Sequence, residues 1–290
     1  MIDLHTHSNA SDGSLTPTEL IAHASNIGLE AIALTDHDTV DGISEALAAA
    51  KHALISFIAG IEISAQYSDN GTMHILGYCV ERNDPDFIEA LEFLKKSRKE
   101  RNPKIIGLLN KAGVSITMED VIAEAGDGQV GRPHFARAII KKGFASSITE
   151  AFEKYIAKGA PCYVDKVRLS PRQSIEMIRN ARGIPVLAHP KTLNIPEEEI
   201  DHLIKNLVAD GLGGIECLYF SHTQEETARY QAHAKKYGLI ITGGTDFHGK
   251  NKPKVRLGVG HGGMNIPNKI FDDLMREYEK LKHGNVSNMA

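Results

Sequence analysis

The sequence predicts an α/β fold in which strands and helices alternate and the strands close into a (β/α) barrel. Three observations support this: short apolar runs alternate with amphipathic segments, several helices have recognisable starts, and histidines or carboxylates follow the apolar runs. Strands separated by helices of this length are joined by crossovers and should run parallel. We expect strands at residues 2–7, 30–35, 57–65, 73–79, 185–188, 214–219 and 239–242.

The helices between these strands are marked by residues that favour helix ends. Thr16 can cap a helix whose first position is Pro17 and whose first turn contains Glu19. Ser170 and Pro171 repeat this arrangement later in the chain. Glycines at positions 28, 183 and 238 stand where such helices should stop. These signals predict a layer of helices around the strands.

Residues 97–165 depart from the alternation because they contain almost no strand pattern. Helical stretches are expected at 105–111, 118–125, 135–141 and 148–157. We interpret the segment as a small helical insertion that forms a lid over the barrel mouth. The predicted division is therefore a discontinuous barrel of residues 1–96 and 166–284, the insertion at 97–165, and a flexible tail at 285–290.

Composition and charge restrict the class of protein. The chain has 290 residues, of which 42% are hydrophobic and 24% charged, as in an ordinary globular protein. A net charge of -4 argues against non-specific binding to a nucleic-acid backbone, but it allows a local basic pocket. With three scattered cysteines, no leader pattern and no apolar run of membrane length, we expect a cytoplasmic protein with reduced thiols and no membrane contact.

Polar side chains recur where the predicted strands end, and they are the types that bind metal ions. In a parallel barrel the carboxyl ends of all strands meet at one mouth, so side chains far apart in sequence can converge there. A single such histidine could equally serve as a cap, but a full set left unpaired would be costly to bury. The candidate ligands are His5, His7, Asp12, His37, Glu62, His74, His189, Asp246 and His248. Six imidazoles and three carboxylates suffice for three metal ions.

The motifs that contain these ligands resemble the polymerase-and-histidinol-phosphatase (PHP) family of metal-dependent phosphoesterases. They are His5-Thr6-His7, Ser11-Asp12-Gly13, Thr35-Asp36-His37-Asp38, Gly60-Ile61-Glu62, His74, Ala188-His189-Pro190 and Gly244-Thr245-Asp246-Phe247-His248. The resemblance implies a distorted seven-stranded (β/α) barrel. Segments 129–136 and 158–164 further resemble the subgroup that hydrolyses 3′,5′-nucleotide bisphosphates and degrades short RNA from its 5′ end.

The resemblance also implies how the ligands are shared among the metals. The first metal would be held by His5, His7, Glu62 and Asp246. Glu62 would bridge to a second metal completed by His74 and His189, and Asp12, His37 and His248 would hold the third. Imidazole and carboxylate without thiolate favour Mn²⁺, with Fe²⁺ or Zn²⁺ as alternatives.

In the expected reaction, a hydroxide that bridges two metals attacks the phosphoryl group, because two shared metals lower the pKa of a bridging water. Asp246 would accept the proton of the water, and His189 or His248 would assist the leaving oxygen. The products would be a 5′-mononucleotide and the released 3′-phosphate.

A substrate with two phosphates needs cations beyond the metals. Candidates lie beside glycine or proline turns, and the predicted substrate-binding residues are Arg132, His134, Lys158 and His222, with Arg168 and Lys191 as weaker candidates. The basic run at residues 95–101 is interpreted as a solvated helix face or a hinge into the insertion, with a role in gripping RNA as the alternative.

Three other functions remain open at this point. The same chemistry could serve histidinol phosphate or another small phosphomonoester, although the insertion favours a larger substrate. A barrel that hydrolyses amides would not need the ligands of a third metal, which argues against that function. A non-catalytic module would not need a complete set of metal ligands, which argues against that alternative too. We expect a phosphorylated nucleotide or a short RNA end as the substrate and no stable protein partner.

Overall fold

The computed structural model describes residues 1–67, 71–126 and 128–286. Seven strands form one sheet in which neighbours in space are also neighbours in sequence. The strands are β1 (Ile2–Asp3), β2 (Ala31–Leu34), β3 (Ser56–Ala65), β4 (Met73–Tyr78), β5 (Ile184–Leu187), β6 (Gly214–Tyr219) and β7 (Ile240–Gly244). Backbone bonds from Leu4 to Gly243 and from His7 to Phe247 join the first and last strands, so the sheet curls almost into a barrel.

One strand corrects the prediction of an all-parallel barrel. β4 is antiparallel to both β3 and β5, while the other neighbouring pairs are parallel. The reason is the short connection between β3 and β4, since residues 66–72 cannot hold the crossover that a parallel pair requires. The start of β4 therefore lies beside the end of β3, where Ser64 pairs with His74. His74 reaches the mouth from the beginning of its strand.

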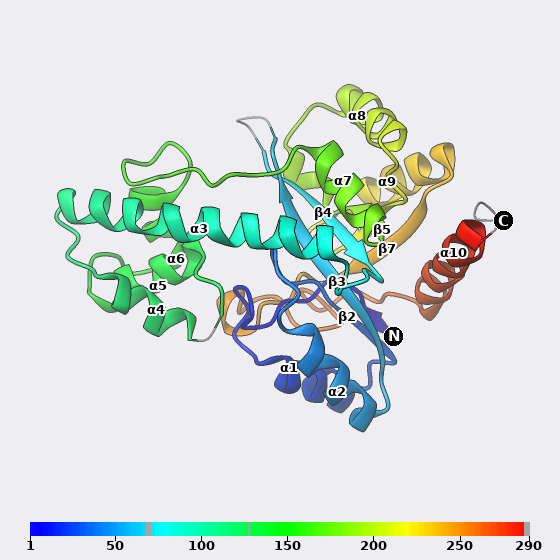
Figure 1. Cartoon of the computed structure of the whole chain (residues 1–290), viewed down its shortest axis with the longest axis horizontal. Coiled ribbons are helices and arrows are strands. Elements are labelled where there is room, and N and C mark those ends of the chain that lie inside the picture. The colour runs from blue at the N-terminus through cyan, green and yellow to red at the C-terminus, as the bar shows by residue number, and fades with distance from the viewer. Residues whose placement is uncertain (68–70, 127, 287–290) are drawn as a thin grey trace.

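Helices cover the sheet on its outside (Figure 1). They are α1 (Pro17–Asn26), α2 (Ile43–Ala53), α7 (Pro171–Asn180), α8 (Glu197–Ala209), α9 (Gln224–Tyr237) and α10 (Asn268–Val286). The predicted starts are confirmed, because Thr16 and Ser170 each accept a hydrogen bond from the third helical N–H. Gly238 ends α9 in the left-handed conformation. No described helix is long and apolar enough to cross a membrane.

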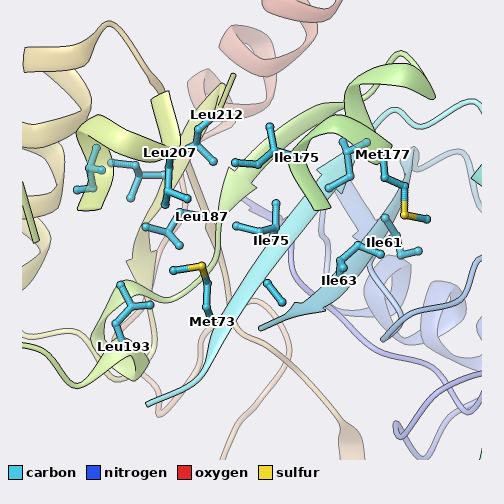
Figure 2. Close-up of a cluster of buried hydrophobic side chains, with 14 of the residues drawn as sticks. Ile61, Ile63, Met73, Ile75, Ile175, Met177, Leu187, Leu193, Leu207 and Leu212 are labelled. Atoms are coloured by element: carbon cyan, nitrogen blue, oxygen red, sulfur yellow. The ribbon is translucent and has the colours of Figure 1, made fainter. Parts of the chain in front are cut away.

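Apolar side chains between these layers form the core. Figure 2 shows one cluster in which Ile61, Ile75 and Leu187 from the strands meet Ile175 of α7. Two further clusters fill the barrel and the space under α1 and α2. Burial of these side chains is the main force that holds strands and helices in place. It fixes the strand ends from which the polar residues project.

The middle segment contains helices and turns but no strand among its described residues. α3 (Pro85–Lys111) extends from the barrel, and α4 (Met118–Ala125), α5 (Arg132–Lys141) and α6 (Ile148–Ala151) gather around its far part, with a π-helical turn at Phe152–Ile156 (Figure 1). These helices enclose a hydrophobic cluster of their own that includes Phe135 and Ile139. The predicted boundary at residue 97 falls inside α3, so one helix belongs to both parts. An independent lid stays a prediction.

Candidate metal centre

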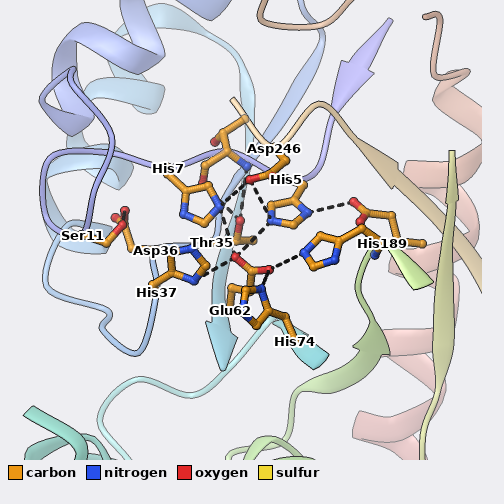
Figure 3. A network of polar contacts seen from close by, with 12 residues as sticks. His5, His7, Ser11, Thr35, Asp36, His37, Glu62, His74, His189 and Asp246 are labelled. Carbon is orange, nitrogen blue, oxygen red and sulfur yellow. Dashed lines mark hydrogen bonds and ion pairs between the residues drawn. The ribbon is translucent and has the colours of Figure 1, made fainter. Parts of the chain in front are cut away.

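The nine candidate ligands lie together at one end of the barrel. His5 and His7 follow β1, His37 follows β2, Glu62 lies in β3 and His74 in β4. His189 directly follows β5, whereas Asp246 and His248 follow β7 and Asp12 lies in the turn after His7. Figure 3 shows the labelled side chains directed toward one another; they are His5, His7, His37, His74, His189, Glu62 and Asp246. β6 contributes none of the nine.

Glu62 is fully buried and stands at the middle of five imidazole rings. Its Oε1 lies 2.8 Å from Nδ1 of His74 and 2.9 Å from Nε2 of His189. Its Oε2 faces the three remaining rings, at 3.0 Å from Nδ1 of His37 and 3.3 Å from Nε2 of both His5 and His7. The two oxygens of one carboxylate thus divide the histidines into two groups.

The ligand atoms form three groups in which all members lie within 4.8 Å of one another. One joins His5, His7, Glu62 and Asp246; another joins His7, Asp12, His37 and His248; the third joins His37, Glu62 and His74. Nε2 of His248 lies 3.2 Å from Oδ1 of Asp12. One group has the members of the first expected ligand set. His7 and His37 each belong to two groups, and His189 belongs to none of the three.

Several atoms at this centre are buried without a hydrogen-bond partner of good geometry. They are Nε2 of His5, both ring nitrogens of His7, Nδ1 of His37 and Oε2 of Glu62. Leaving such atoms unpaired costs on the order of 1–3 kcal/mol each. Divalent cations among nitrogen and carboxylate ligands would remove this cost. The donor set therefore fits divalent metal ions.

The ionisable groups at this centre shift one another strongly. Burial alone would raise the pKa of Glu62, but His37 and His74 hold it well below its usual value. Burial opposes a charge on His7, yet contacts with Asp246 and Glu62 raise its pKa to about 9. Burial lowers the pKa values of His37, His74 and His248 instead, so these rings favour the neutral form that binds metal ions.

A cavity of about 420 Å³ opens beside the centre, between the barrel mouth and the helical segment. Asp12, His37 and His74 line it on the side of the ligands. The opposite side is strongly basic and is lined by Arg98, Arg101, Arg132, Lys158, Lys166 and Arg168. The predicted residues Arg132 and Lys158 thus face the same space as the ligands.

Arg98 and Arg101 correct the interpretation of the basic run as a solvated face. Only 9% of Arg98 and 5% of Arg101 is exposed, although the neighbouring Lys96 and Lys99 are exposed. A spacing of three residues places both arginines on one side of α3, and that side faces the cavity. Burial and the nearby Arg98 lower the pKa of Arg101 to about 9.

The arginines in this cavity differ in whether they have an anionic partner. Arg98 pairs with the buried Asp38, whose Oδ2 also accepts Nζ of Lys166 at 2.6 Å. The hydrogen bonds of Arg101 go to the neutral Asn102, and Arg132 lies over the ring of Tyr163 at 5.3 Å. Among the described residues, neither Arg101 nor Arg132 has a carboxylate partner.

The other predicted binding residues lie outside the cavity. His134 is buried in the insertion and its Nδ1 accepts the N–H of Gly131, while burial lowers its pKa to about 4. His222 packs against Tyr219 and bonds the carbonyl of Cys217. Lys191 pairs with Glu226. These three residues are not among the described residues that line the space.

Comparisons with known proteins find a matching family and similar proteins. The model of a family described as PHP domain matches residues 3–250. A 3′,5′-nucleoside bisphosphate phosphatase of Chromobacterium violaceum is 34% identical over 248 residues, which cover 85% of this chain and 87% of that protein. A 5′-3′ exoribonuclease of Haemophilus influenzae is 36% identical over 246 residues, covering 85% and 89%.

A solved structure shares the fold over nearly the whole chain. The structure of an amidohydrolase from Chromobacterium violaceum, with bound sulfate and no metal, has a TM-score of 0.84 at 32% identity. The match covers 97% of this chain and 96% of the other. The nearly closed barrel and its helical insertion are thus a shared architecture.

Proposed function

The chain belongs to the PHP domain family, and we propose that it hydrolyses 3′,5′-nucleotide bisphosphates, together with the 5′-phosphorylated ends of short RNA. Hydrolysis of phosphate esters is the reaction class of its relatives. The substrate follows from one observation: the cavity joins the ligand cluster to Arg101 and Arg132, which have no carboxylate partner within the described part of the chain.

The ligand cluster is proposed to hold three divalent ions, with Mn²⁺ the best match to its donors. His5, His7, Glu62 and Asp246 would take one ion; His74 and His189 would share Glu62 for another; Asp12, His37 and His248 would take the third. When bound, such ions make water more acidic and stabilise charge on phosphoryl oxygens.

The remaining chemistry falls to side chains of the chain itself. Oδ1 of Asp246 lies 3.2 Å from Nε2 of His7, and we assign it the proton of the attacking water. Nδ1 of His189 lies 2.9 Å from the hydroxyl of Thr192, which fixes the ring plane. His189 or His248 is then the group that protonates the leaving oxygen.

The basic wall of the cavity is proposed to bind the phosphate that is not cleaved. Arg101 is buried and Arg132 is half-buried, and neither has a carboxylate partner among the described residues. Such guanidiniums favour an anion, because a charge-assisted pair forms where water has already been removed. Arg101 joins Arg132, Lys158 and Arg168 in this role. A small monoester, with a single phosphate at the metals, would leave Arg101 and Arg132 without a partner. This argument favours the bisphosphate over histidinol phosphate.

A phosphate-release assay tests the proposal directly. Mn²⁺-loaded protein is supplied with adenosine 3′,5′-bisphosphate, with 5′-AMP, with histidinol phosphate and with a 5′-phosphorylated RNA trimer. The proposal expects the bisphosphate to have the highest kcat/KM, 5′-AMP to be the product, and the trimer to be cut from its 5′ end. Faster turnover of histidinol phosphate than of the bisphosphate would overturn it.

A further inference from the structure

β6 offers no candidate ligand, yet two of its side chains contact three of the nine. Glu216 is fully buried, although it lies in the otherwise apolar strand Gly214–Tyr219. A charged side chain inside an apolar strand is the feature of the sequence that could have identified Glu216 as a functional residue. Tyr219, at the end of the strand, is also buried.

Glu216 bonds two ligand residues at once, one through each oxygen. Its Oε1 lies 2.9 Å from Nδ1 of His5, and its Oε2 accepts the backbone N–H of His189 at 2.7 Å. Because a carboxylate accepts hydrogen bonds, this contact favours the His5 tautomer whose Nδ1 carries the proton. The lone pair of Nε2 is thereby directed to the centre, 3.3 Å from Oε2 of Glu62.

The second bond holds a backbone in an uncommon conformation. His189 has a φ of 26° and a ψ of 64°, a region that side chains other than glycine rarely adopt. The hydrogen bond from its N–H to Glu216 stabilises this backbone conformation. In that conformation Nε2 of the imidazole lies 2.9 Å from Oε1 of Glu62. One carboxylate thus orients a histidine from each of two ligand sets.

A bulge in β6 supplies the third contact. The pairing with β7 shifts between Glu216 and Leu218, which inserts one extra residue and turns the rest of the strand. The hydroxyl of Tyr219 then donates to Oδ2 of Asp246 at 2.9 Å. Nζ of Lys252 donates to the same oxygen at 2.7 Å, and with Oδ2 held by these two donors Oδ1 remains directed at His5 and His7.

We propose that Glu216 and Tyr219 are positioning residues that fix the orientation of the metal-binding side chains of His5, His189 and Asp246. The inference rests on the proposed metal centre. It adds two residues of the bulged strand β6 that contact the ligands from outside the centre. Such outer partners commonly contribute about 10- to 100-fold to metal affinity. A merely space-filling role would leave metal affinity unchanged.

The test measures metal binding by the full chain without any substrate. Glu216→Gln preserves shape but can accept only one of the two hydrogen bonds, because its amide nitrogen faces either the His5 ring or the His189 N–H. We expect Mn²⁺ affinity by calorimetric titration to fall about 10- to 100-fold, and the visible spectrum of the Co²⁺-loaded protein to change. Tyr219→Phe should weaken binding less, because it removes one neutral donor.

Tyr155→Phe is the matched control, since this buried tyrosine donates to the carbonyl of Phe144 and packs in the hydrophobic cluster of the helical segment. It should lower thermal stability in chelator while the Mn²⁺ affinity stays at the wild-type value. Wild-type affinity and Co²⁺ spectrum in both Glu216→Gln and Tyr219→Phe would overturn the inference. Normal Mn²⁺ binding by a protein that cleaves no phosphate ester would instead refute the proposed function and leave this inference intact.

Discussion

His37 and Glu62 are joined through both backbone and side chain. They form a parallel bridge that extends the pairing of β2 with β3, and Nδ1 of His37 lies 3.0 Å from Oε2 of Glu62. Glu62 also donates its N–H to Asp36 and accepts the N–H of Asp38. The carboxylate at the middle of the centre is therefore fixed by the sheet itself.

Glu62→Gln should abolish most of the activity while the barrel still folds. The amide cannot bind cations with both atoms, and several kcal/mol of transition-state stabilisation depend on them. At about 1.4 kcal/mol per tenfold change, we expect kcat/KM to fall by roughly 10³-fold or more. Steady-state kinetics in excess Mn²⁺ measure this, with circular dichroism as the check on folding. Near-normal turnover would show that the centre is misassigned.

The loaded protein should contain three divalent ions per chain. Three groups of ligand atoms lie within binding reach of one another, although two of them share Glu62 and two share His37. Elemental analysis after reconstitution with Mn²⁺ and gel filtration gives the count. A value that settles at one ion per chain would contradict the prediction, and treatment with a chelator should remove activity reversibly.

Arg132→Ala should impair the bisphosphate selectively. The lost charged hydrogen bonds are worth about 1–3 kcal/mol, or roughly 5- to 150-fold in kcat/KM. An aryl phosphate has no second phosphate and should lose little. Arg101→Ala should behave in the same way because it lines the same wall. Equal losses on both substrates would place these arginines at the phosphate that reacts, and no loss would make them structural.

Asp38→Asn should destabilise the protein by about 3–5 kcal/mol, because it leaves the buried Arg98 and Lys166 without their shared carboxylate. Lys166→Met is the comparison. Burial and the neighbouring Arg98 lower the pKa of Lys166 to about 7, so its charge is already weakly held. Its loss should cost less than Asp38→Asn, because Asp38 keeps its pair with Arg98. Urea unfolding of the chelated proteins measures both, and equal costs would contradict the assignment of Asp38.

Two glycine-to-alanine changes should have opposite effects on stability. A Cβ at Gly244 would overlap Cβ and N of His5, so β7 and the segment after β1 would be forced apart at a cost of about 1–3 kcal/mol. Gly107 lies within α3 with open space around its Cβ position, and alanine there should stabilise by about 0.5–1 kcal/mol. Thermal unfolding distinguishes the two, and a stabilising Gly244→Ala would refute the close approach.

The sequence by itself determined the alternating elements, the helix starts and the identity of the residues at the strand ends. These features are encoded locally, since a cap at Thr16 or Ser170 acts within one turn of its own helix. The ligand motifs are local as well, because strand ends in a barrel converge whatever lies between them. His5 and Asp246 could therefore be placed together across 240 residues of chain.

Only the tertiary structure decided the direction of β4, the burial of Arg98 and Arg101, and the contacts of Glu216. Each of these features depends on which side chains a neighbouring strand or helix places against the segment. A short connection reversed β4, and the barrel mouth covered one side of α3 that a basic run alone would leave in solvent. Glu216 gained its role from His5 and His189, which lie far from it in sequence. The charge and the hydrophobic periodicity of a segment can be read from that segment alone. The burial of a side chain and the pairing of a strand depend on a second segment as well, so they are decided only when the two segments pack together.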